Sequence, residues 1–139
     1  MPDTSLATDL RIAVNRLSRT LRAQKADAAM TDAQFSALAR LHREGAMTLA
    51  ELSRQDGVTP PSMTKTVAVL VERGLATKGD HGDDRRKVRI CVTPAGSAVV
   101  EETRRRRDGW LSPRLGTLTP DERRTLADAT EIMRRLAQQ

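Results

Sequence analysis

Hydrophobic residues near the N-terminus recur every three or four positions, which is the spacing of one face of an α-helix. They are Leu6, Leu10, Ala13, Val14, Leu17 and Leu21. Arginines occupy several of the intervening positions, so the pattern predicts an amphipathic first helix. A helix with such an apolar stripe needs a partner against which the stripe is buried.

Two helices with clear start and stop signals follow. A capping box over Thr31–Gln34, in which the first and last side chains each bond the other's backbone amide, predicts the start of a second helix that ends at Gly45. The same motif over Thr48–Glu51 opens a third helix that Asp56–Gly57 closes after barely two turns. So short a helix needs tertiary support.

A fourth helix begins only a few residues later. Thr59 can cap it, and Pro60 stands at the first helical position, where a missing N–H costs nothing. Its predicted buried stripe consists of Met63, Val67 and Leu70. Gly74 ends it, so the third and fourth helices form a helix, a tight turn and a helix.

Beyond Gly74 the period of the hydrophobic pattern changes to two, which is typical of a half-buried strand. The alternating residues are Val88, Ile90 and Val92. The segment from Leu75 to Lys78 can supply an antiparallel mate, which makes the polar stretch 79–86 the tip of a hairpin.

Two more helices complete the predicted elements. Thr93 and Pro94 restart a helix that we expect to reach about Leu111, with Pro113 and Gly116 marking its end. A capping box over Thr119–Glu122 opens the last helix. The apolar face of that last helix is formed by Leu126, Ala129, Ile132, Met133 and Leu136.

The order of these elements predicts a mainly α fold with a small β-hairpin wing, in one domain spanning residues 1–139. A winged helix-turn-helix lobe covers about 31–93, and the flanking segments 1–30 and 94–139 form a dimerisation region, because their apolar stripes are unsatisfied within the lobe. A two-fold dimer presents two recognition helices, which match half-sites about 34 to 36 Å apart on one face of duplex DNA. We therefore expect the DNA target to be nearly palindromic.

Amino-acid composition limits the classes of partner that the protein can bind. Lys and Arg number 24 against 18 Asp and Glu, a net charge of +6, which favours a polyanion such as nucleic acid. With one Trp, one Phe and no Tyr, stacking on single-stranded bases is disfavoured. No apolar run approaches the roughly 18 residues of a membrane span. The single cysteine, Cys91, agrees with a reducing compartment, so we expect a cytoplasmic protein.

Several motifs, in this order along nearly the whole chain, resemble the MarR family of winged helix-turn-helix regulators. They are Thr31-Asp32-Ala33-Gln34-Phe35 with Leu38, Met47-Thr48-Leu49-Ala50-Glu51-Leu52, Thr59 to Lys65, Leu70, Arg73-Gly74-Leu75, Asp84-Arg85-Arg86 and Val92-Thr93-Pro94-Ala95-Gly96. The resemblance implies an obligate dimer built from the first and last helices that binds promoter DNA. It also implies release of that DNA by a small aromatic or phenolic effector or by an oxidant.

The resemblance places the reading residues at the start of the fourth helix. Pro61, Ser62, Thr64 and Lys65 lie off the buried stripe, where a recognition helix of this family meets the major groove. The hydroxyls can donate to or accept from base edges or phosphates, and the lysine can reach either. The alternative is an ordinary solvated helix face.

In the wing, the family pattern places an acidic residue two positions before an arginine, so that the carboxylate fixes the guanidinium for the minor groove. Asp84 and Arg86 occupy those positions, and Arg85 and Lys87 would hold phosphates. A charged loop without DNA contacts is the alternative interpretation.

Other chemistry is weakly indicated. Asp80, His81, Asp83 and Asp84 offer metal-ligand types, but they stand in a glycine-rich tip without a second ligand group, so we expect no metal or cofactor. No nucleophile with a base is recognisable, and an enzyme is not expected. The sequence thus predicts a ligand-responsive repressor acting as a homodimer. A winged-helix scaffold that binds a protein and no DNA is the alternative, and the effector site cannot be assigned to residues.

Overall fold

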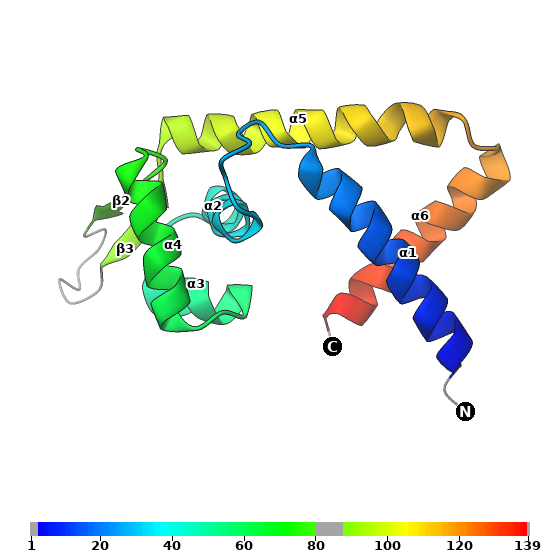
Figure 1. Ribbon diagram of the computed structural model, residues 1–139, viewed down its shortest axis with the longest axis horizontal. Coiled ribbons are helices and arrows are strands. Elements are labelled where there is room, and N and C mark those ends of the chain that lie inside the picture. Colours follow the sequence, from blue (N-terminus) through cyan, green and yellow to red (C-terminus); the bar gives the residue numbers. More distant parts are fainter. Residues whose placement is uncertain (1–2, 80–87, 139) are drawn as a thin grey trace.

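The computed structural model describes residues 3–79 and 88–138, which form six helices and three strands. The elements are α1 (Thr4–Ala23), α2 (Asp32–Glu44), β1 (Met47–Thr48), α3 (Leu49–Asp56), α4 (Pro60–Glu72), β2 (Ala76–Gly79), β3 (Arg89–Val92), α5 (Pro94–Gly116) and α6 (Pro120–Ala137). A lobe of α2 to β3 lies at one end of the long helix α5, and α1 and α6 descend from its other half (Figure 1). This is the mainly α, winged-helix architecture that the sequence predicts.

The predicted helix starts are confirmed in atomic detail. Complete capping boxes open α2, α3 and α6, with Thr31, Thr48 and Thr119 as the capping residues. The Thr59 side chain accepts the Ser62 amide at the start of α4. Each such cap satisfies an amide that the helix leaves without a partner, and is worth about 1 kcal/mol.

The sheet differs from the predicted hairpin in two ways. Its strand order is β1-β3-β2, all antiparallel, and β1 adds a third strand in which Met47 pairs with Ile90. Val88, expected on the buried face of the hairpin, lies before β3 and is 55% exposed, whereas Ile90 is 2% exposed. Among the described residues the pairing of β3 with both neighbours begins at Arg89, so Val88 lies outside the sheet and beyond its packed face.

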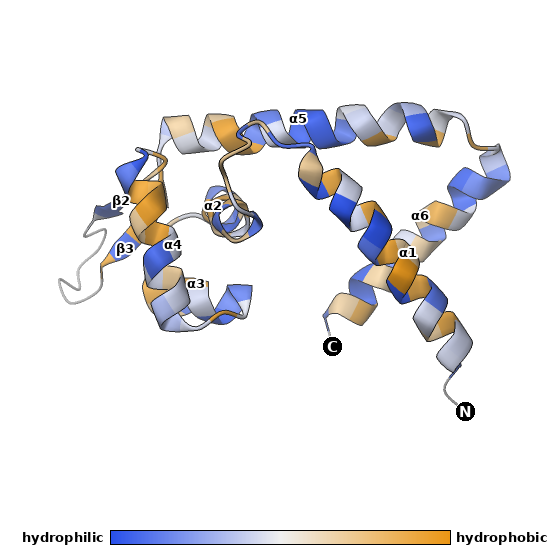
Figure 2. Ribbon diagram, viewed as in Figure 1, coloured by the Kyte–Doolittle hydropathy of each residue, from blue (hydrophilic) through white to orange (hydrophobic). Residues whose placement is uncertain are grey.

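The hydrophobic core belongs entirely to the lobe and the first turns of α5. Its thirteen buried apolar residues run from Met30 to Val100 and come from α2, α3, α4, the sheet and α5, with Met30 and Leu75 in the connecting segments. Neither α1 nor α6 has a buried residue, although hydrophobic residues recur along both helices (Figure 2).

The end of α5 corrects a prediction. The helix does not stop near Leu111 but continues to Gly116, with Pro113 inside it. A proline lacks only its own N–H, so Pro113 removes the single bond to the Gly109 carbonyl, and it does so in the last turn, where few bonds remain to be lost. Gly116 is the end of the helix, as expected.

Candidate nucleic-acid interface

The turn between α3 and α4 is fixed from both sides. Gly57 adopts a left-handed conformation with φ of 66°, which favours glycine, and the Val58 amide bonds the Ser53 carbonyl at 3.1 Å. On the α2 side, Arg40 Nε lies 2.5 Å from Asp56 Oδ1, and the Asp56 side chain is only 4% exposed. This ion pair ties the last residue of α3 to α2.

Helix α4 separates its residues into two faces, as its spacing predicts. Met63, Val67 and Leu70 are buried in the core. The four candidate reading residues, Pro61, Ser62, Thr64 and Lys65, are all exposed. The structure therefore presents them together on the outside of the lobe.

Hydroxyl groups at the start of α4 are hydrogen-bonded locally. Thr59 Oγ1 and Ser62 Oγ share a hydrogen bond of 3.1 Å, and Thr64 Oγ1 donates to the Pro60 carbonyl at 2.9 Å. All three hydroxyl-bearing residues are exposed. This edge of the lobe thus offers neutral polar groups of defined orientation beside a lysine.

The wing begins close to this face. The candidate wing residues Asp84, Arg85, Arg86 and Lys87 lie outside the described residues. At the base of the wing, a hollow of about 260 Å³ is lined by Leu49, Thr64, Lys78, Val88 and Ile90. Lys78 of β2 is exposed there and lines the hollow together with Thr64 of α4.

Lys78 is a candidate that the sequence analysis missed. In the sequence it is one polar residue of a short strand, and only the pairing of β2 with β3 brings it beside α4. The alternation gave no signal, because Lys78 is two positions after the buried Ala76 and so lies on the same face of the strand.

Comparison with known proteins identifies the fold. Residues 30–88 match the model of the MarR family. An HTH-type transcriptional regulator of Mycobacterium tuberculosis, MT0903.1, is 41% identical over 94% of this chain and 92% of its own. The chain belongs to the MarR family. It is a DNA-binding transcriptional regulator, and the family does not consist of enzymes.

Solved MarR-like structures superpose along nearly the whole chain. RV1404 of Mycobacterium tuberculosis is 26% identical, with a TM-score of 0.84 over 97% of this chain and 94% of its own. A transcriptional regulator of Pseudomonas aeruginosa is 28% identical, with a TM-score of 0.83 over 97% and 96%. The match extends beyond the lobe and includes the terminal helices.

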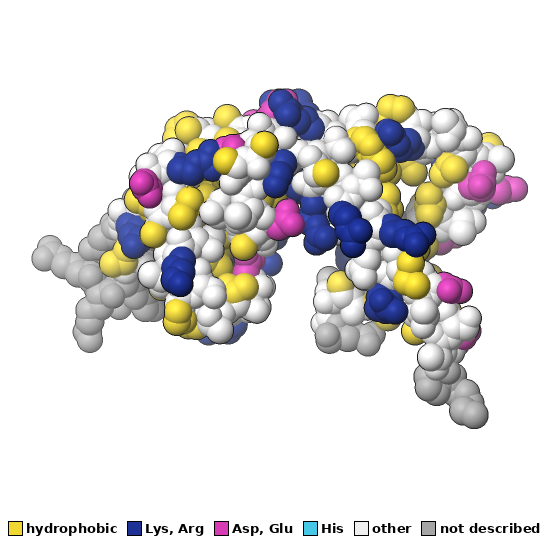
Figure 3. All heavy atoms as spheres, viewed as in Figure 1, with side chains coloured by type: hydrophobic (Ala, Val, Ile, Leu, Met, Phe, Trp, Pro, Cys, Tyr) yellow, Lys and Arg dark blue, Asp and Glu magenta, His cyan; other side chains and the backbone are white. Residues whose placement is uncertain are grey.

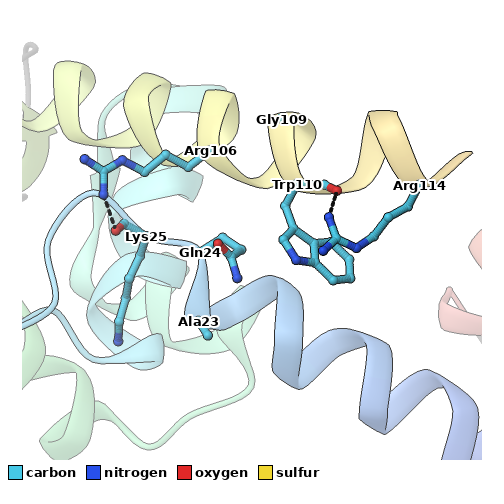
Figure 4. Close-up of a pocket in the computed structure, with 7 residues that line it drawn as sticks. All are labelled: Ala23, Gln24, Lys25, Arg106, Gly109, Trp110 and Arg114. Carbon is cyan, nitrogen blue, oxygen red and sulfur yellow. Dashed lines mark hydrogen bonds between the residues drawn. The ribbon is translucent and has the colours of Figure 1, made fainter. Parts of the chain in front are cut away.

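A second feature of this MarR protein is a pocket between the end of α1 and the middle of α5 (Figure 4). Its volume is about 480 Å³, and it is lined by Ala23, Gln24, Lys25, Arg106, Gly109, Trp110 and Arg114. The Arg114 guanidinium lies 4.0 Å from the centroid of the indole ring, and Arg106 donates to the Lys25 carbonyl at 3.1 Å. The Arg106 guanidinium lies at the other end of the pocket and also pairs with Glu102, whereas Arg114 lies on the indole ring (Figure 4). A guanidinium beside an aromatic ring suits an anionic ligand with a flat ring.

The third feature is an apolar groove of about 590 Å³ between α1, α5 and α6. Leu10, Val14 and Leu17 line it on α1, and Leu126 and Met133 line it on α6.

Arg107 of α5 also lines this groove. It donates to the Leu21 carbonyl at 3.1 Å, and its guanidinium lies 4.5 Å from the Phe35 ring centroid. Burial lowers the pKa of Arg107 because it desolvates the charged form, an effect that Asp32 opposes. The arginine joins α1, α2 and α5 where the lobe meets the terminal helices.

Basic side chains are spread across the face seen in Figure 3, from the lobe to α1, and acidic side chains are interspersed with them. None of the helices in 3–79 and 88–138 combines the length and apolar character that crossing a membrane requires.

Proposed function

We propose that this MarR protein is a homodimeric repressor that reads a near-palindromic operator with two copies of α4 and two wings. The proposal rests on one combination of features: α4 has an exposed face, and the terminal helices α1 and α6 contain no buried residue within one chain. The exposed face of α4 would read the DNA. The terminal helices would join two chains, so that two such faces meet one duplex.

The dimer is supported by the terminal helices. Ten large hydrophobic residues are exposed in the described part of the chain, and eight of them lie on α1 or α6. They are Leu6, Ile12, Val14, Leu17, Leu126, Ile132, Met133 and Leu136. Helices of this length without packing are marginal in water, so a second copy that buries both apolar faces explains how they stay helical.

On DNA, each group of residues has its own task. Pro61, Ser62 and Thr64 meet base edges in the major groove, and Lys65 reaches a base or a phosphate. Asp84 orients Arg86 toward the minor groove, while Arg85 and Lys87 hold phosphates. Lys78, at the base of the wing, adds a phosphate contact between the two. Because bound Lys and Arg side chains release the counterions condensed on DNA, the affinity falls steeply as the salt concentration rises.

One relative supports the proposal of repression in place of activation. MdtR of Bacillus subtilis, an HTH-type transcriptional repressor, is 24% identical over 96% of this chain and 86% of its own. A dimer spanning an operator within a promoter would occlude that promoter. We place the protein in the cytoplasm, because its lone cysteine favours a reducing compartment.

Ligand control is the second part of the proposal. In BpsR of Bordetella bronchiseptica, whose structure is 27% identical with a TM-score of 0.68, DNA binding is regulated by 6-hydroxynicotinic acid. We place an aromatic acid of this class in the pocket of Trp110, where Arg114 would bind its carboxylate. Binding there would shift the dimer between DNA-competent and splayed arrangements.

A gel-shift titration tests DNA binding. The probe is DNA upstream of the coding sequence, and wild type is compared with Lys65→Ala and Arg86→Ala over a range of salt concentrations. Each variant should weaken binding, and Lys65→Ala should also lower the slope of log affinity against log salt by about one if Lys65 holds a phosphate. Arg124→Ala removes the same charge from an exposed site on α6 and should leave the slope unchanged. A protein-binding scaffold would give no retarded band.

A thermal-shift titration tests the effector pocket. The probe is 6-hydroxynicotinic acid, and a bound ligand at 100 times its Kd should add about 2.7 kcal/mol of stability. Arg114→Gln should abolish the shift, whereas Arg124→Gln should keep it. An equal shift in both variants would place the ligand elsewhere.

A further inference from the structure

The connection between α1 and α2 is attached to α5 at two points, and it passes beside that helix in Figure 1. The Ala26 amide donates to Thr103 Oγ1 at 3.2 Å, and Thr103 is only 1% exposed. Arg106 donates to the Lys25 carbonyl at 3.1 Å. The connection therefore has a defined position on α5, at the boundary between the lobe and the terminal helices.

Asp27 joins this connection to the recognition helix. Its Oδ2 forms an ion pair with Arg73, the residue that caps the C-terminal end of α4, and its Oδ1 accepts the Ala29 amide at 3.0 Å. The side chains of Asp27 and Arg73 are 24% and 34% exposed, so water screens their attraction only in part. One carboxylate thus links the end of α4 to a segment that α5 holds in place.

The pocket of Trp110 lies against the same connection. Lys25 lines it from the connection, and Arg106 lines it from α5 (Figure 4). Lys25 Nζ also donates to the Met30 carbonyl at 2.8 Å, across the turn that contains Asp27. A ligand that moves Lys25 or Arg106 would therefore also displace the segment that carries Asp27.

We propose that Asp27 is a positioning residue that holds α4 in its DNA-reading orientation and transmits movements of the Trp110 pocket to α4. The inference rests on the proposed function, because it assumes that α4 enters the major groove and that the pocket binds an effector. It goes beyond that function by naming the contact that joins the pocket to the recognition helix.

Asp27→Asn removes the ion pair with little other change. The side-chain oxygen of asparagine can still accept the Ala29 amide, so the turn is kept, whereas its neutral NH₂ group cannot pair with a guanidinium. The substitution also removes one negative charge, which by itself strengthens binding to DNA. Glu72→Gln removes the same charge from the exposed last residue of α4 and measures that effect alone.

The experiment compares the affinities of the full chain for two duplexes in a gel shift. The first carries two half-sites that the wild-type protein selects from a randomised pool, and the second has one extra base pair between them. The insertion moves one half-site by about 3.4 Å and rotates it by about 35° relative to the other. Recognition helices that are held firmly lose affinity on this insertion, and loosely held ones lose less.

Relative to Glu72→Gln, Asp27→Asn should lower the affinity for the first duplex about threefold, the effect of a partly exposed ion pair. Its affinity for the second duplex should be unchanged, so the discrimination between the duplexes falls by the same factor. Arg73→Lys keeps a cation beside Asp27 and should retain the wild-type discrimination. A variant that is merely less stable would lower both affinities equally.

The same proteins test transmission from the pocket. Each is saturated with 6-hydroxynicotinic acid, with saturation judged by thermal shift, and the factor by which the acid changes the affinity for the first duplex is measured. Asp27→Asn should bring this factor closer to one, whereas Glu72→Gln should keep the wild-type factor. The thermal shift itself should be the same in all three proteins, because Asp27 does not line the pocket.

Two results would overturn the inference. If Asp27→Asn keeps the wild-type discrimination between the duplexes, Asp27 does not position α4. If the acid changes DNA affinity by the same factor in Asp27→Asn and Glu72→Gln, the pocket acts on α4 through other contacts. Failures of the proposed function are distinguishable from these. Without any thermal shift, the ligand and its transmission both fail, while the two duplexes still decide whether Asp27 positions α4. Without a retarded band for the wild-type protein, DNA reading fails and the whole inference fails with it.

Discussion

Gly96 allows α5 to approach the sheet, and replacing it should be costly. It is buried in the first turn of α5, where a Cβ would lie 2.1 Å from the Leu75 carbonyl oxygen and 2.8 Å from a methyl of Val92. Since real Cβ atoms essentially never approach closer than 3.0 Å, the carbonyl or the helix must move by about 1 Å.

That displacement would break identifiable bonds. The Leu75 carbonyl accepts the Thr93 amide at 3.0 Å, and the Gly96 amide donates to Thr93 Oγ1 at 3.1 Å. Losing one such hydrogen bond costs about 1 kcal/mol, losing the cap costs about as much again, and overpacking adds about 1 to 3 kcal/mol. Allowing about 1 kcal/mol for the better helix propensity of alanine, Gly96→Ala should lower the free energy of unfolding by about 2 to 4 kcal/mol.

Gly109 is the matched control in the same helix. A Cβ built there meets nothing within 4 Å, so Gly109→Ala should raise the free energy of unfolding by about 0.5 to 1 kcal/mol. Urea unfolding followed by circular dichroism, at one protein concentration for all variants, gives both values. The reasoning would be refuted if Gly96→Ala were as stable as Gly109→Ala.

Three further predictions concern the lobe and the terminal helices. Arg40→Met leaves the buried Asp56 carboxylate without its cation and should cost about 3 kcal/mol in urea unfolding; a loss below about 1 kcal/mol would contradict this. Hydrogen bonds from the backbone and side chain of Thr119 lower the pKa of Glu122, so its stabilising effect is present above pH 4.5 and is lost as pH falls through the lowered pKa. The melting temperatures of wild type and Glu122→Gln should therefore converge from pH 6 to pH 3, and a constant difference would contradict the assignment. Met133→Asp should yield single subunits in sedimentation, whereas Arg124→Asp, nine residues earlier and therefore on the opposite side of α6, should not.

Local signals in the sequence were sufficient for much of this fold. The threonine caps of α2, α3 and α6 are set by residues three positions apart, and such short-range motifs do not depend on the rest of the chain. The two faces of α4 follow from helical periodicity alone. For this reason the exposure of Ser62 and Lys65 could be predicted.

Features that depend on distant pairing could not be predicted. β1 exists because Met47 meets Ile90, and two residues are too few to show a period. The Arg40–Asp56 ion pair and the position of Lys78 beside Thr64 likewise join segments whose approach only the folded core defines. Pro113 misled the prediction for a different reason, since near the end of a helix a proline costs too little to stop it.

The most direct test of the central claim is the dependence of binding on half-site spacing. Affinity and stoichiometry are measured on a duplex carrying two selected half-sites, and again after insertion of about 5 base pairs, half a helical turn, between them. Two terminally joined subunits should bind the first duplex together and lose most of their specific affinity for the second, because one recognition helix is rotated off its groove. Equal affinity for both duplexes, with each half-site filled independently, would contradict the account.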